Sequence, residues 1–395
     1  MQSTKTILFI NGANTVGGAE QSMIQTIKYL SNLHYRICVA IPKAPGDPLG
    51  ESLKPYVDKI IYTKIPVWSA TSAPSTIQKI KMKFYRLRHY GIPLMVLARL
   101  FMISRKFAVD LVHTNTLHTN IGRRLARWLK VPHVQHLREL SGCSEISQIS
   151  IHGQEDPVSF RRKHGQNDGL IANSKFCLDF NRSWFEGDKE KIIYNPVQSI
   201  SIKKQISREN VVRVSMLANV TSSWKNHQLF IKIAAAYLQN HPQGKIIFKI
   251  YGKIPTGTSS YYQGLINLVD RFKISEYVHF MNSIPASEAY AGTDILVHTS
   301  PFESFGRIFI EAMGCGIPVI GVASGGAKEL ITHEYNGLLI KGSNLKGFVE
   351  GIERVIADNN LREHLISNGR ATAVGFSPEK VLQELPNFYK QVMNA

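Results

Sequence analysis

The sequence predicts an α/β fold made of two domains, and three observations lead to this prediction. Short apolar segments alternate with segments of helical periodicity in both halves of the chain. A polar segment without periodicity, residues 198–210, lies between the two halves. The length of 395 residues also exceeds what one compact core usually holds. Two such halves joined by a linker imply a cleft between the domains.

The N-terminal half begins as a parallel α/β unit. Residues 6–10 are expected to form a strand, residues 19–30 a helix and residues 35–41 a second strand. The loop after the first strand contains Gly17 and Gly18, but it matches neither the P-loop nor the dinucleotide-binding pattern of glycines. Two interpretations stay open: a phosphate site made of free backbone N–H groups, or a plain tight turn.

The whole chain carries a net charge of +18, and the basic residues of 59–109 contribute to it because this stretch contains no acidic residue. Helical periodicity over residues 75–107 places apolar side chains beside basic ones, which suits a helix lying on an anionic membrane surface. A core-facing helix with a solvated basic face is the alternative. Nucleic acid is not expected as a partner, because no recognised nucleic-acid-binding motif accompanies the charge. The candidate membrane-binding residues are Lys79, Lys81, Lys83, Arg86 and Arg88.

Targeting and membrane-spanning segments are not expected. The longest apolar run, residues 92–103, is interrupted by Arg99 and is too short to cross a bilayer of about 30 Å. The first apolar segment is too short for a signal peptide. The four cysteines show no metal-ligand or redox spacing. The sequence therefore predicts a cytoplasmic protein with reduced thiols.

Polar side chains follow the later strands of the N-terminal half. These strands are expected at residues 109–113, 133–137, 169–173 and 191–194. The carboxyl ends of parallel strands face the cleft of an open α/β sheet, so the polar residues there are candidates for binding a ligand. They are His136, Asn115, Arg138, Glu139 and Ser174. His133 alternates with His136 along one strand, and it is expected to face the core.

The C-terminal half repeats the alternation of strands and helices. The expected strands lie at residues 211–217, 245–251, 278–280, 295–298 and 317–320. The expected helices lie at residues 227–239, 262–272, 287–290, 348–357, 361–368 and 378–392, the last being amphipathic.

Residues 300–326 form the segment with the clearest chemical pattern. Glu303 and Glu311 are separated by seven residues, and Gly306 between them allows the backbone to come close to a ligand. A helix is expected to start after Gly306, and another after residues 325–326, so that backbone N–H groups at two helix starts form an anion site. Two carboxylates beside an anion site suit a ligand with an anionic middle and hydroxyl groups at both ends.

These residues resemble those of the retaining glycosyltransferases of family 4, which have the GT-B fold of two Rossmann-like domains facing across a cleft. The resemblance is most specific in Glu303-x7-Glu311 with Ser304-Phe305-Gly306, and in the glycines and apolar residues of 316–326. Weaker matches follow the family order along the chain at residues 17–20, 136–139, 173–174 and 224–227.

The resemblance implies a domain organisation. An N-terminal, acceptor-side domain would comprise residues 1–197, and a linker residues 198–210. The C-terminal, nucleotide-sugar-binding domain would comprise residues 211–375. A C-terminal helix, residues 376–395, would pack back toward the N-terminal domain.

The resemblance also implies roles for single residues. Glu311 would hold the ribose hydroxyls, Glu303 would contact the transferred sugar, and Lys225 would neutralise the leaving phosphate. His136 would lie near the sugar. Catalysis would therefore rest on His136, Glu303 and Lys225, and donor binding on Gly17, Gly18, Asn219, Ser304, Phe305, Gly306 and Glu311. The cleft residues Asn115, Arg138, Glu139 and Ser174 are candidates for the acceptor side.

Asn219 departs from the family pattern. The family usually has an arginine six positions before the lysine that corresponds to Lys225, so Asn219 removes one positive charge from the phosphate site. Arg307 or Lys328 could take its place, or Lys225 and the helix start could suffice. No D-x-D sequence occurs, as expected for the metal-independent chemistry of this fold.

The implied function is transfer of a sugar from a UDP- or GDP-linked donor to a hydroxyl of a glycan or lipid-linked acceptor, with retention of configuration and without a cofactor. Such a reaction serves the synthesis of cell-surface polysaccharide or glycolipid, at the inner face of the cytoplasmic membrane. Two alternatives use the same fold: a nucleotide-sugar epimerase and a non-catalytic nucleotide-sugar-binding protein. A glycosidase is disfavoured, because Glu311 lies within a helix rather than across a glycosidic bond from Glu303.

Overall fold

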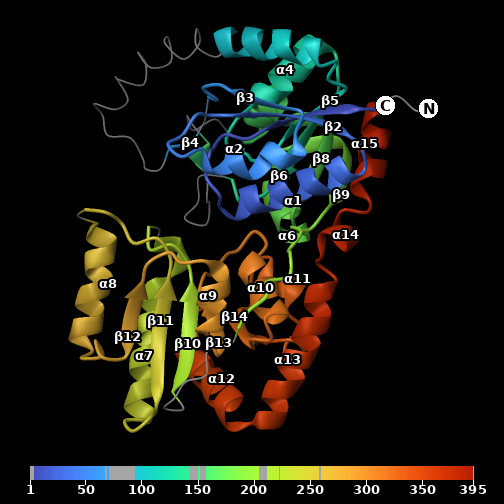
Figure 1. The fold of residues 1–395 in the computed structure, drawn as a ribbon. Helices are drawn as coiled ribbons and strands as arrows, with labels where there is room; N and C mark the ends of the chain where they lie inside the picture. Colours follow the sequence, from blue (N-terminus) through green and yellow to red (C-terminus); the bar gives the residue numbers. More distant parts are fainter. Residues whose placement is uncertain are drawn as a thin grey trace. The chain divides into compact units, whose positions relative to one another are not determined.

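A computed structural model of the chain confirms the predicted α/β fold with two parallel sheets (Figure 1). The structure describes residues 4–66, 69–70, 94–141, 150–151, 157–203, 211–221, 223–257 and 259–394. The chain divides into two compact units. The first comprises residues 1–196 and 378–395, and the second comprises residues 197–377.

The first unit is built on a seven-stranded parallel sheet with the order β3-β2-β1-β5-β6-β8-β9. Strand β1 lies between β2 and β5, with Ile7 opposite both Ile37 and Leu111. The strand order reverses at this point, and ligands of such sheets bind beside the reversal. The strands are β1 (Thr6–Ile10), β2 (Arg36–Ile41), β3 (Lys59–Tyr62), β5 (Leu111–Thr114), β6 (His133–Leu137), β8 (Gln166–Ala172) and β9 (Glu186–Ile192). A separate antiparallel pair joins β4 (Ser69–Ala70) and β7 (Ser150–Ile151).

Both faces of this sheet are covered, as the fully buried β1 requires. Alternate residues of β1 point to opposite faces. Ile7 and Phe9 belong to one apolar cluster, together with α1 (Gly18–Asn32), α2 (Pro48–Leu53) and the C-terminal helices. Leu8 and Ile10 belong to another, together with a helix at residues 94–106 and α4 (Ile121–Leu129). Shorter helices are α5 (Pro157–Phe160) and α6 (Lys175–Asn181).

The C-terminal segment packs on the first unit, which confirms the prediction for its destination. Leu385, Phe388, Tyr389 and Val392 are all buried in the first unit's core. The predicted single helix at residues 378–392 is wrong, because the structure has α14 (Pro378–Val381) and then α15 (Leu385–Met393). Pro386 lacks the N–H that would continue the helix across residues 382–384.

The second unit is built on a six-stranded parallel sheet with the order β12-β11-β10-β13-β14-β15, whose strand order reverses between β10 and β13. Its strands are β10 (Val212–Leu217), β11 (Ile246–Tyr251), β12 (Val278–Met281), β13 (Ile295–His298), β14 (Val319–Val322) and β15 (Leu338–Ile340). Its helices are α7 (His227–Asn240), α8 (Ser260–Arg271), α9 (Ala286–Ala291), α10 (Arg307–Gly314), α11 (Ala327–Leu330), α12 (Leu345–Ala357) and α13 (Asn359–Val374).

Several element boundaries differ from the prediction. Strand β9 was expected at residues 191–194 but occupies Glu186–Ile192, where exposed acidic residues alternate with less exposed positions at the sheet edge. Strand β3 was not predicted, because only Ile61 of its four residues is buried and the stretch looks basic. Strand β14 lies two residues later than expected. Weak periodicity at a sheet edge accounts for β9 and β3, whereas β14 lies between β13 and β15 and is shifted although it is not an edge strand.

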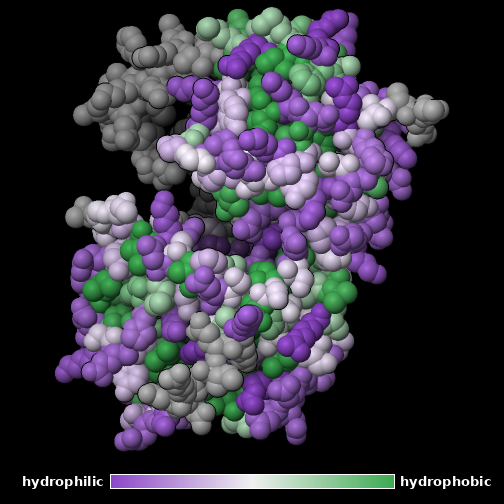
Figure 2. Space-filling view, in the orientation of Figure 1, coloured by the Kyte–Doolittle hydropathy of each residue, from purple (hydrophilic) through white to green (hydrophobic). Residues whose placement is uncertain are grey.

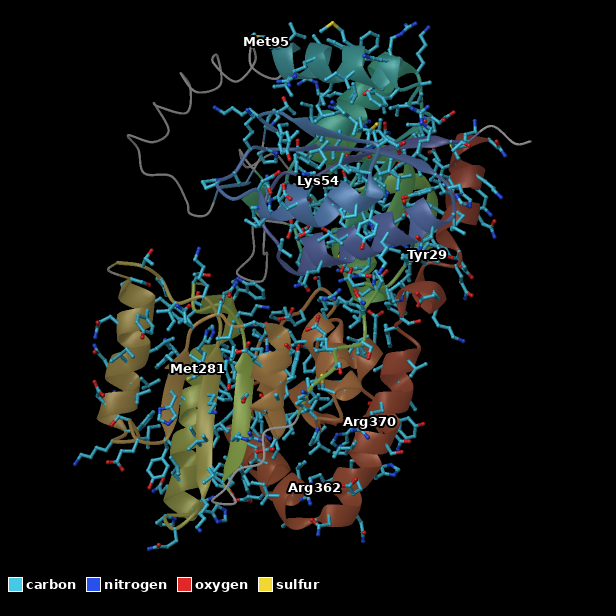
Figure 3. All side chains as sticks on the ribbon, in the orientation of Figure 1. Tyr29, Lys54, Met95, Met281, Arg362 and Arg370 are labelled. Atoms are coloured by element: carbon cyan, nitrogen blue, oxygen red, sulfur yellow. The ribbon has the colours of Figure 1, made fainter. Side chains whose placement is uncertain are left out.

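The basic stretch is only partly described. Lys79, Lys81, Lys83, Arg86 and Arg88 lie outside the described residues. From residue 94 the stretch is helical, and Figure 3 labels Met95 near the start of this helix. No helix in the described part of the chain is long and apolar enough to cross a membrane.

Candidate functional site

An ion pair joins the two loops that leave the second sheet where its strand order reverses. Lys225 lies in the loop after β10 and Glu303 in the loop after β13. The Lys225 Nζ donates to Glu303 Oε1 at 2.5 Å. His298, the last residue of β13, places its Nε2 at 2.7 Å from the same oxygen. The Trp224 ring lies 3.9 Å from the Lys225 ammonium, which holds the cation by a cation–π contact.

The Glu303 carboxyl is ionised in this cluster. Burial acts to raise the pKa of Glu303, but the Lys225 ammonium and the His298 imidazole outweigh it and hold this pKa well below its usual range. Burial lowers the pKa of His298, so the ring is neutral and donates from Nε2. Both donors use Oε1, which leaves Oε2 without a hydrogen bond among the described residues.

Gly306 and Gly326 bring two loops together behind this carboxylate. Gly306 precedes α10 with a φ of 97°, a conformation that side chains rarely adopt, and a Cβ there would lie 2.8 Å from the Phe309 ring. A Cβ on Gly326 would lie 2.6 Å from the Phe305 Cα, and the Gly326 N–H donates to the Glu303 carbonyl at 2.8 Å. The two loops therefore pack backbone against backbone at the start of α10.

Glu311 lies on the second turn of α10 and is held from two sides. The Arg307 Nε donates to its Oε1 at 2.7 Å, one helical turn away. The Tyr290 hydroxyl of α9 donates to its Oε2 at 2.8 Å. Burial raises the pKa of Tyr290 well above its ordinary value, and the Glu311 carboxylate raises it further, so this hydroxyl keeps its proton. The orientation of the Glu311 carboxylate is thereby fixed.

Asn219, which stands where an arginine was expected, is exposed after β10. Its Oδ1 accepts a hydrogen bond from the Lys253 backbone N–H at 2.9 Å, so the amide ties together the loops that follow β10 and β11. Of the two cations suggested as substitutes, Arg307 is bound to Glu311, and Lys328 is exposed on α11.

In the first unit, the loops after β1, β5 and β6 share one buried network. The Asn115 Nδ2 donates to Asn11 Oδ1 at 3.0 Å, and the Arg138 Nε donates to Asn115 Oδ1 at 3.0 Å. Arg138 also donates to the side chain of Asn195, which follows β9. The Asn11 Nδ2 in turn donates to Glu20 Oε1 at 3.2 Å. Buried polar groups whose hydrogen bonds are satisfied in this way hold these loops rigidly against one another.

The Gly17–Gly18 turn begins α1. The Gly17 N–H donates to Glu20 Oε2 at 3.1 Å, so the helix's own first turn satisfies this donor. That contact favours the interpretation of Gly17 as part of a helix cap.

His136 lies at the carboxyl end of β6, in contact with His113 of β5. The His136 Nδ1 is 3.3 Å from His113 Nε2, and the His113 Nδ1 is 2.6 Å from the Tyr389 hydroxyl of α15. The Phe9 ring stacks on His113 at 4.6 Å. Burial lowers the pKa of both histidines well below the ordinary value, and the nearby Arg138 guanidinium lowers them further.

The remaining predicted residues have structural partners. Ser174 caps α6 by accepting from the Cys177 N–H at 2.8 Å. Glu139 accepts from the Leu117 N–H at 3.1 Å, and burial raises its pKa. His133 is buried, with its ring nitrogens 2.8 Å from Thr114 Oγ1 and 2.9 Å from Asn167 Oδ1, which confirms that it faces the core.

Sequence reasoning missed several partners of these residues. His298 could have been found, because it ends a buried strand as His113 and His136 do. Tyr290 and Tyr389 carry no signal of spacing or composition, since their hydroxyls meet the site only through tertiary packing.

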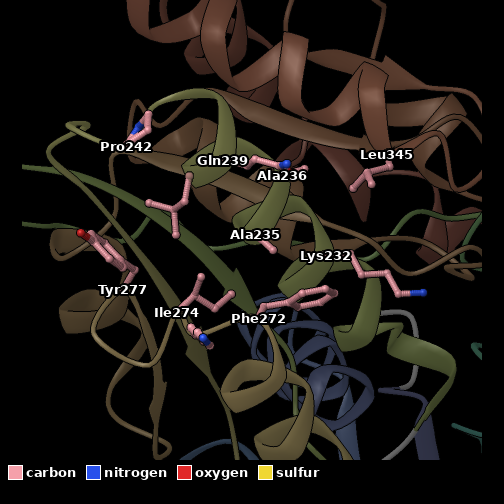
Figure 4. A pocket seen from close by; sticks show the side chains of 11 residues that line it. Lys232, Ala235, Ala236, Gln239, Pro242, Phe272, Ile274, Tyr277 and Leu345 are labelled. Atoms are coloured by element: carbon pink, nitrogen blue, oxygen red, sulfur yellow. The ribbon is translucent and has the colours of Figure 1, made fainter.

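A pocket of about 570 Å³ lies elsewhere in the second unit (Figure 4). Its lining comes mainly from α7 and the turn between α8 and β12, including Ala235, Gln239, Phe272, Ile274 and Tyr277. None of the predicted site residues lines it.

The chain matches family models over most of its length. Residues 16–199 match the model described as Glycosyltransferase Family 4, and residues 199–372 match that described as Glycosyl transferases group 1. A glycosyltransferase of Methanocaldococcus jannaschii is 24% identical over 338 residues, which cover 78% of this chain and 84% of that protein. A D-inositol 3-phosphate glycosyltransferase of Actinosynnema mirum is 22% identical over 74% of this chain and 69% of that protein.

Solved structures share the fold. HepE of Anabaena, in complex with UDP and glucose, has a TM-score of 0.74 and 20% identity. The match covers 98% of this chain and 100% of the HepE chain. Sucrose-phosphate synthase of Thermosynechococcus elongatus has a TM-score of 0.73 and 18% identity, covering 99% of both chains. The two matched family models, which together span residues 16–372, and this shared fold make the chain a glycosyltransferase of the GT-B type.

Proposed function

We propose that this glycosyltransferase moves a sugar from a nucleotide diphosphate sugar, with retention of configuration and without a metal ion, to a hydroxyl of a glycan or lipid-linked acceptor. The observation that carries the proposal is the cluster of Lys225, Glu303 and His298 where the second sheet's strand order reverses. An ionised carboxylate with one unengaged oxygen can accept from sugar hydroxyls. The ammonium beside it can stabilise the charge that develops on a leaving diphosphate.

Glu311 is proposed to bind the ribose. A carboxylate accepts up to about four hydrogen bonds, so each Glu311 oxygen keeps acceptor capacity beyond its contact with Arg307 or Tyr290. Two ribose hydroxyls can then donate to the two oxygens. The diphosphate is proposed to lie at Ser304, Phe305 and Gly306, beside the start of α10, where the positive end of the helix dipole favours an anion.

The donor is proposed to carry UDP. HepE, which shares the fold, was solved in complexes with UDP and with UDP-glucose. A panel of UDP- and GDP-linked hexoses in isothermal calorimetry tests this choice. Glu311→Ala should weaken donor binding by at least about tenfold, since it removes the proposed ribose acceptor. Glu350→Ala on the exposed face of α12 is the control. Unchanged affinity in Glu311→Ala would contradict the ribose assignment.

Release of free nucleotide, with and without a hydroxyl acceptor, tests the transfer. Lys225→Met should lower kcat by about a hundredfold or more with a smaller change in KM, because the charge acts on the transition state. Lys346→Met is the matched control, since Lys346 is 85% exposed on α12. Retention is measured from the anomeric coupling of the product, and metal independence from activity in excess EDTA. An inverted product or loss of activity in EDTA would refute the corresponding part.

The two alternatives predict different products. An epimerase converts the nucleotide-sugar without any acceptor, and a non-catalytic protein binds it without turnover. The same assay separates them, because only a transferase makes nucleotide release depend on the acceptor.

A place on the inner face of the cytoplasmic membrane is proposed from the surface of the first unit. The solvent-facing side of helix 94–106 exposes Leu94, Met95 and Met102, and the neighbouring helix α4 exposes Trp128. The Trp128 ring meets Phe101 edge-on at 6.1 Å, so the two helices share one apolar surface. Figure 2 shows hydrophobic and hydrophilic residues side by side at the top of the view, where this helix lies.

The charge of this surface supports an anionic lipid as the proposed partner. Arg99, Arg105, Lys106 and Arg127 are exposed on the same two helices, and neither helix contains an acidic residue. Exposed apolar side chains beside cations suit the headgroup region of an anionic bilayer. The part of this surface on helix 94–106 lies C-terminal to the five basic residues that the sequence singled out, and both belong to the acid-free stretch 59–109.

Vesicle flotation tests the membrane assignment. The protein should float with vesicles of phosphatidylglycerol but not of phosphatidylcholine, and Arg99→Glu with Arg105→Glu should weaken this binding by at least about tenfold. Lys232→Glu with Lys346→Glu in the second unit is the charge-matched control. If the wild-type protein does not bind anionic vesicles, the membrane assignment is refuted.

A further inference from the structure

His136 ends a buried chain of three hydrogen-bonded side chains in the first unit. The Tyr389 hydroxyl is 2.6 Å from His113 Nδ1, and the His113 Nε2 is 3.3 Å from His136 Nδ1. The Arg138 guanidinium also reaches His136 Nδ1, at 3.3 Å. The other ring nitrogen of His136, Nε2, is buried and has no hydrogen-bond partner in the part of the chain that the structure describes.

The guanidinium sets the direction of every bond in this chain. Arginine has donors only, so His136 Nδ1 must accept and the proton of this ring must lie on Nε2. The His113 Nε2 faces the same acceptor, so it must also donate, and it shares the single lone pair of His136 Nδ1 with the guanidinium. The His113 Nδ1 then accepts, and the Tyr389 hydroxyl donates to it.

The protonation states agree with these directions. Burial lowers the pKa of His113 and His136, and the Arg138 charge lowers them further, so neither ring is an imidazolium. Burial raises the pKa of Tyr389 well above its ordinary value, so the hydroxyl keeps the proton that it donates.

We propose that Tyr389 and Arg138 fix His136 as the neutral tautomer with its proton on Nε2, so that His136 presents a hydrogen-bond donor, and not a base, at the carboxyl end of β6. Only the kinetic test of this proposal rests on the proposed function, because the tautomer follows from contacts within the first unit. Tyr389 and Arg138 are positioning residues. Tyr389, 276 residues beyond His113 in the chain, completes this set of hydrogen bonds by donating to His113 Nδ1.

Nitrogen-15 NMR of the full chain with labelled histidine tests the tautomer without any substrate. The His136 signals, assigned by their absence in His136→Gln, should show a protonated Nε2 and a bare Nδ1, unchanged between about pH 6 and pH 8. A proton on Nδ1, or an imidazolium in this range, would overturn the proposal. This readout stands even if the chain proves to transfer no sugar, so the two failures are distinguishable.

Kinetics test the donor role. Glutamine keeps an N–H donor near the position of Nε2 but is not a base, so His136→Gln should retain kcat/KM within about tenfold, whereas His136→Ala should lose about a hundredfold. Equal loss in both variants, with unchanged thermal unfolding of His136→Gln, would overturn the donor role.

Tyr389→Phe tests the positioning role. It should lower kcat/KM by about tenfold and shift the His113 nitrogen signals, because Nδ1 loses its donor. Tyr35→Phe, which removes a hydroxyl from a tyrosine packed against the same core, is the matched control. Unchanged His113 signals in Tyr389→Phe would overturn the part assigned to Tyr389.

Discussion

Glu303 carries the charge around which the second unit's candidate site is arranged. Its pKa is held far below the ordinary value by Lys225 and His298, despite burial. Lowering the pKa of a carboxyl in the folded state stabilises that state at pH values above the unfolded pKa, which is about 4.3 for glutamate. This stability is lost progressively as the pH falls toward the folded pKa.

Glu303→Gln should therefore lower the thermal unfolding midpoint at pH 7, because Lys225 and His298 keep their places without an anion. The difference from wild type should shrink as the pH falls below about 4.5, since the unfolded chain then takes up the proton that the folded Glu303 carboxyl, with its lowered pKa, does not yet bind. Calorimetric scans of both proteins from about pH 3 to pH 7 measure it. A difference that grows toward acid pH would contradict the assigned ion pair.

Sequence spacing could identify Glu303 and Glu311 but not their environment. Lys225 lies 78 positions before Glu303, and only the adjacency of β10 and β13 makes them partners. Pairing of strands from distant parts of the chain is not encoded in local periodicity. The sequence therefore indicated Lys225 and Glu303 but did not predict that they contact each other and His298.

At the scale of single elements, α10 depends on the backbone of Gly306. The residue has a positive φ, and the Phe309 ring occupies the space where a Cβ would lie. The sequence placed this helix start correctly, because a glycine before an apolar helical face is a local signal. It misplaced β9 and predicted one last helix where the structure has two, because sheet-edge alternation and the effect of Pro386 compete with the apolar pattern.

Gly306→Ala should destabilise the second unit by about 1–3 kcal/mol and lower transfer activity, because alanine is strained at this φ and displaces Phe309. Gly264→Ala is the matched control. Gly264 lies on α8 with nothing within 4 Å of an added Cβ, so this change should be neutral or stabilise the helix by up to about 1 kcal/mol. Chemical denaturation monitors both variants, and equal effects would contradict the strain argument.

At the scale of the whole molecule, the first unit is discontinuous in sequence. Its sheet comes from residues 6–192, but α15 fills one face of its core after the chain has passed through the second unit. The amphipathic pattern predicted a helix at residues 378–392. That this helix packs on the first unit was predicted from the family resemblance alone, because an apolar helix face does not specify the surface against which it packs.

Phe388→Ala should destabilise the first unit by about 3–5 kcal/mol, since it removes a buried ring from the α15 contact. Hydrogen exchange should show faster exchange in β1, β5 and β6 with little change in β10 to β14. Val374→Ala is the control, because Val374 is 66% exposed at the end of α13. Faster exchange confined to the second unit would contradict the packing of α15.

The late arrival of α15 also bears on biosynthesis. During translation the residues of the first sheet emerge before the second unit, but Leu385, Phe388, Tyr389 and Val392, which complete its core, emerge only after it. Domains generally fold as they emerge, N-terminal first. Here one apolar face of the first unit stays uncovered until the second unit has been synthesised. We therefore expect chaperones to bind the nascent chain during this interval.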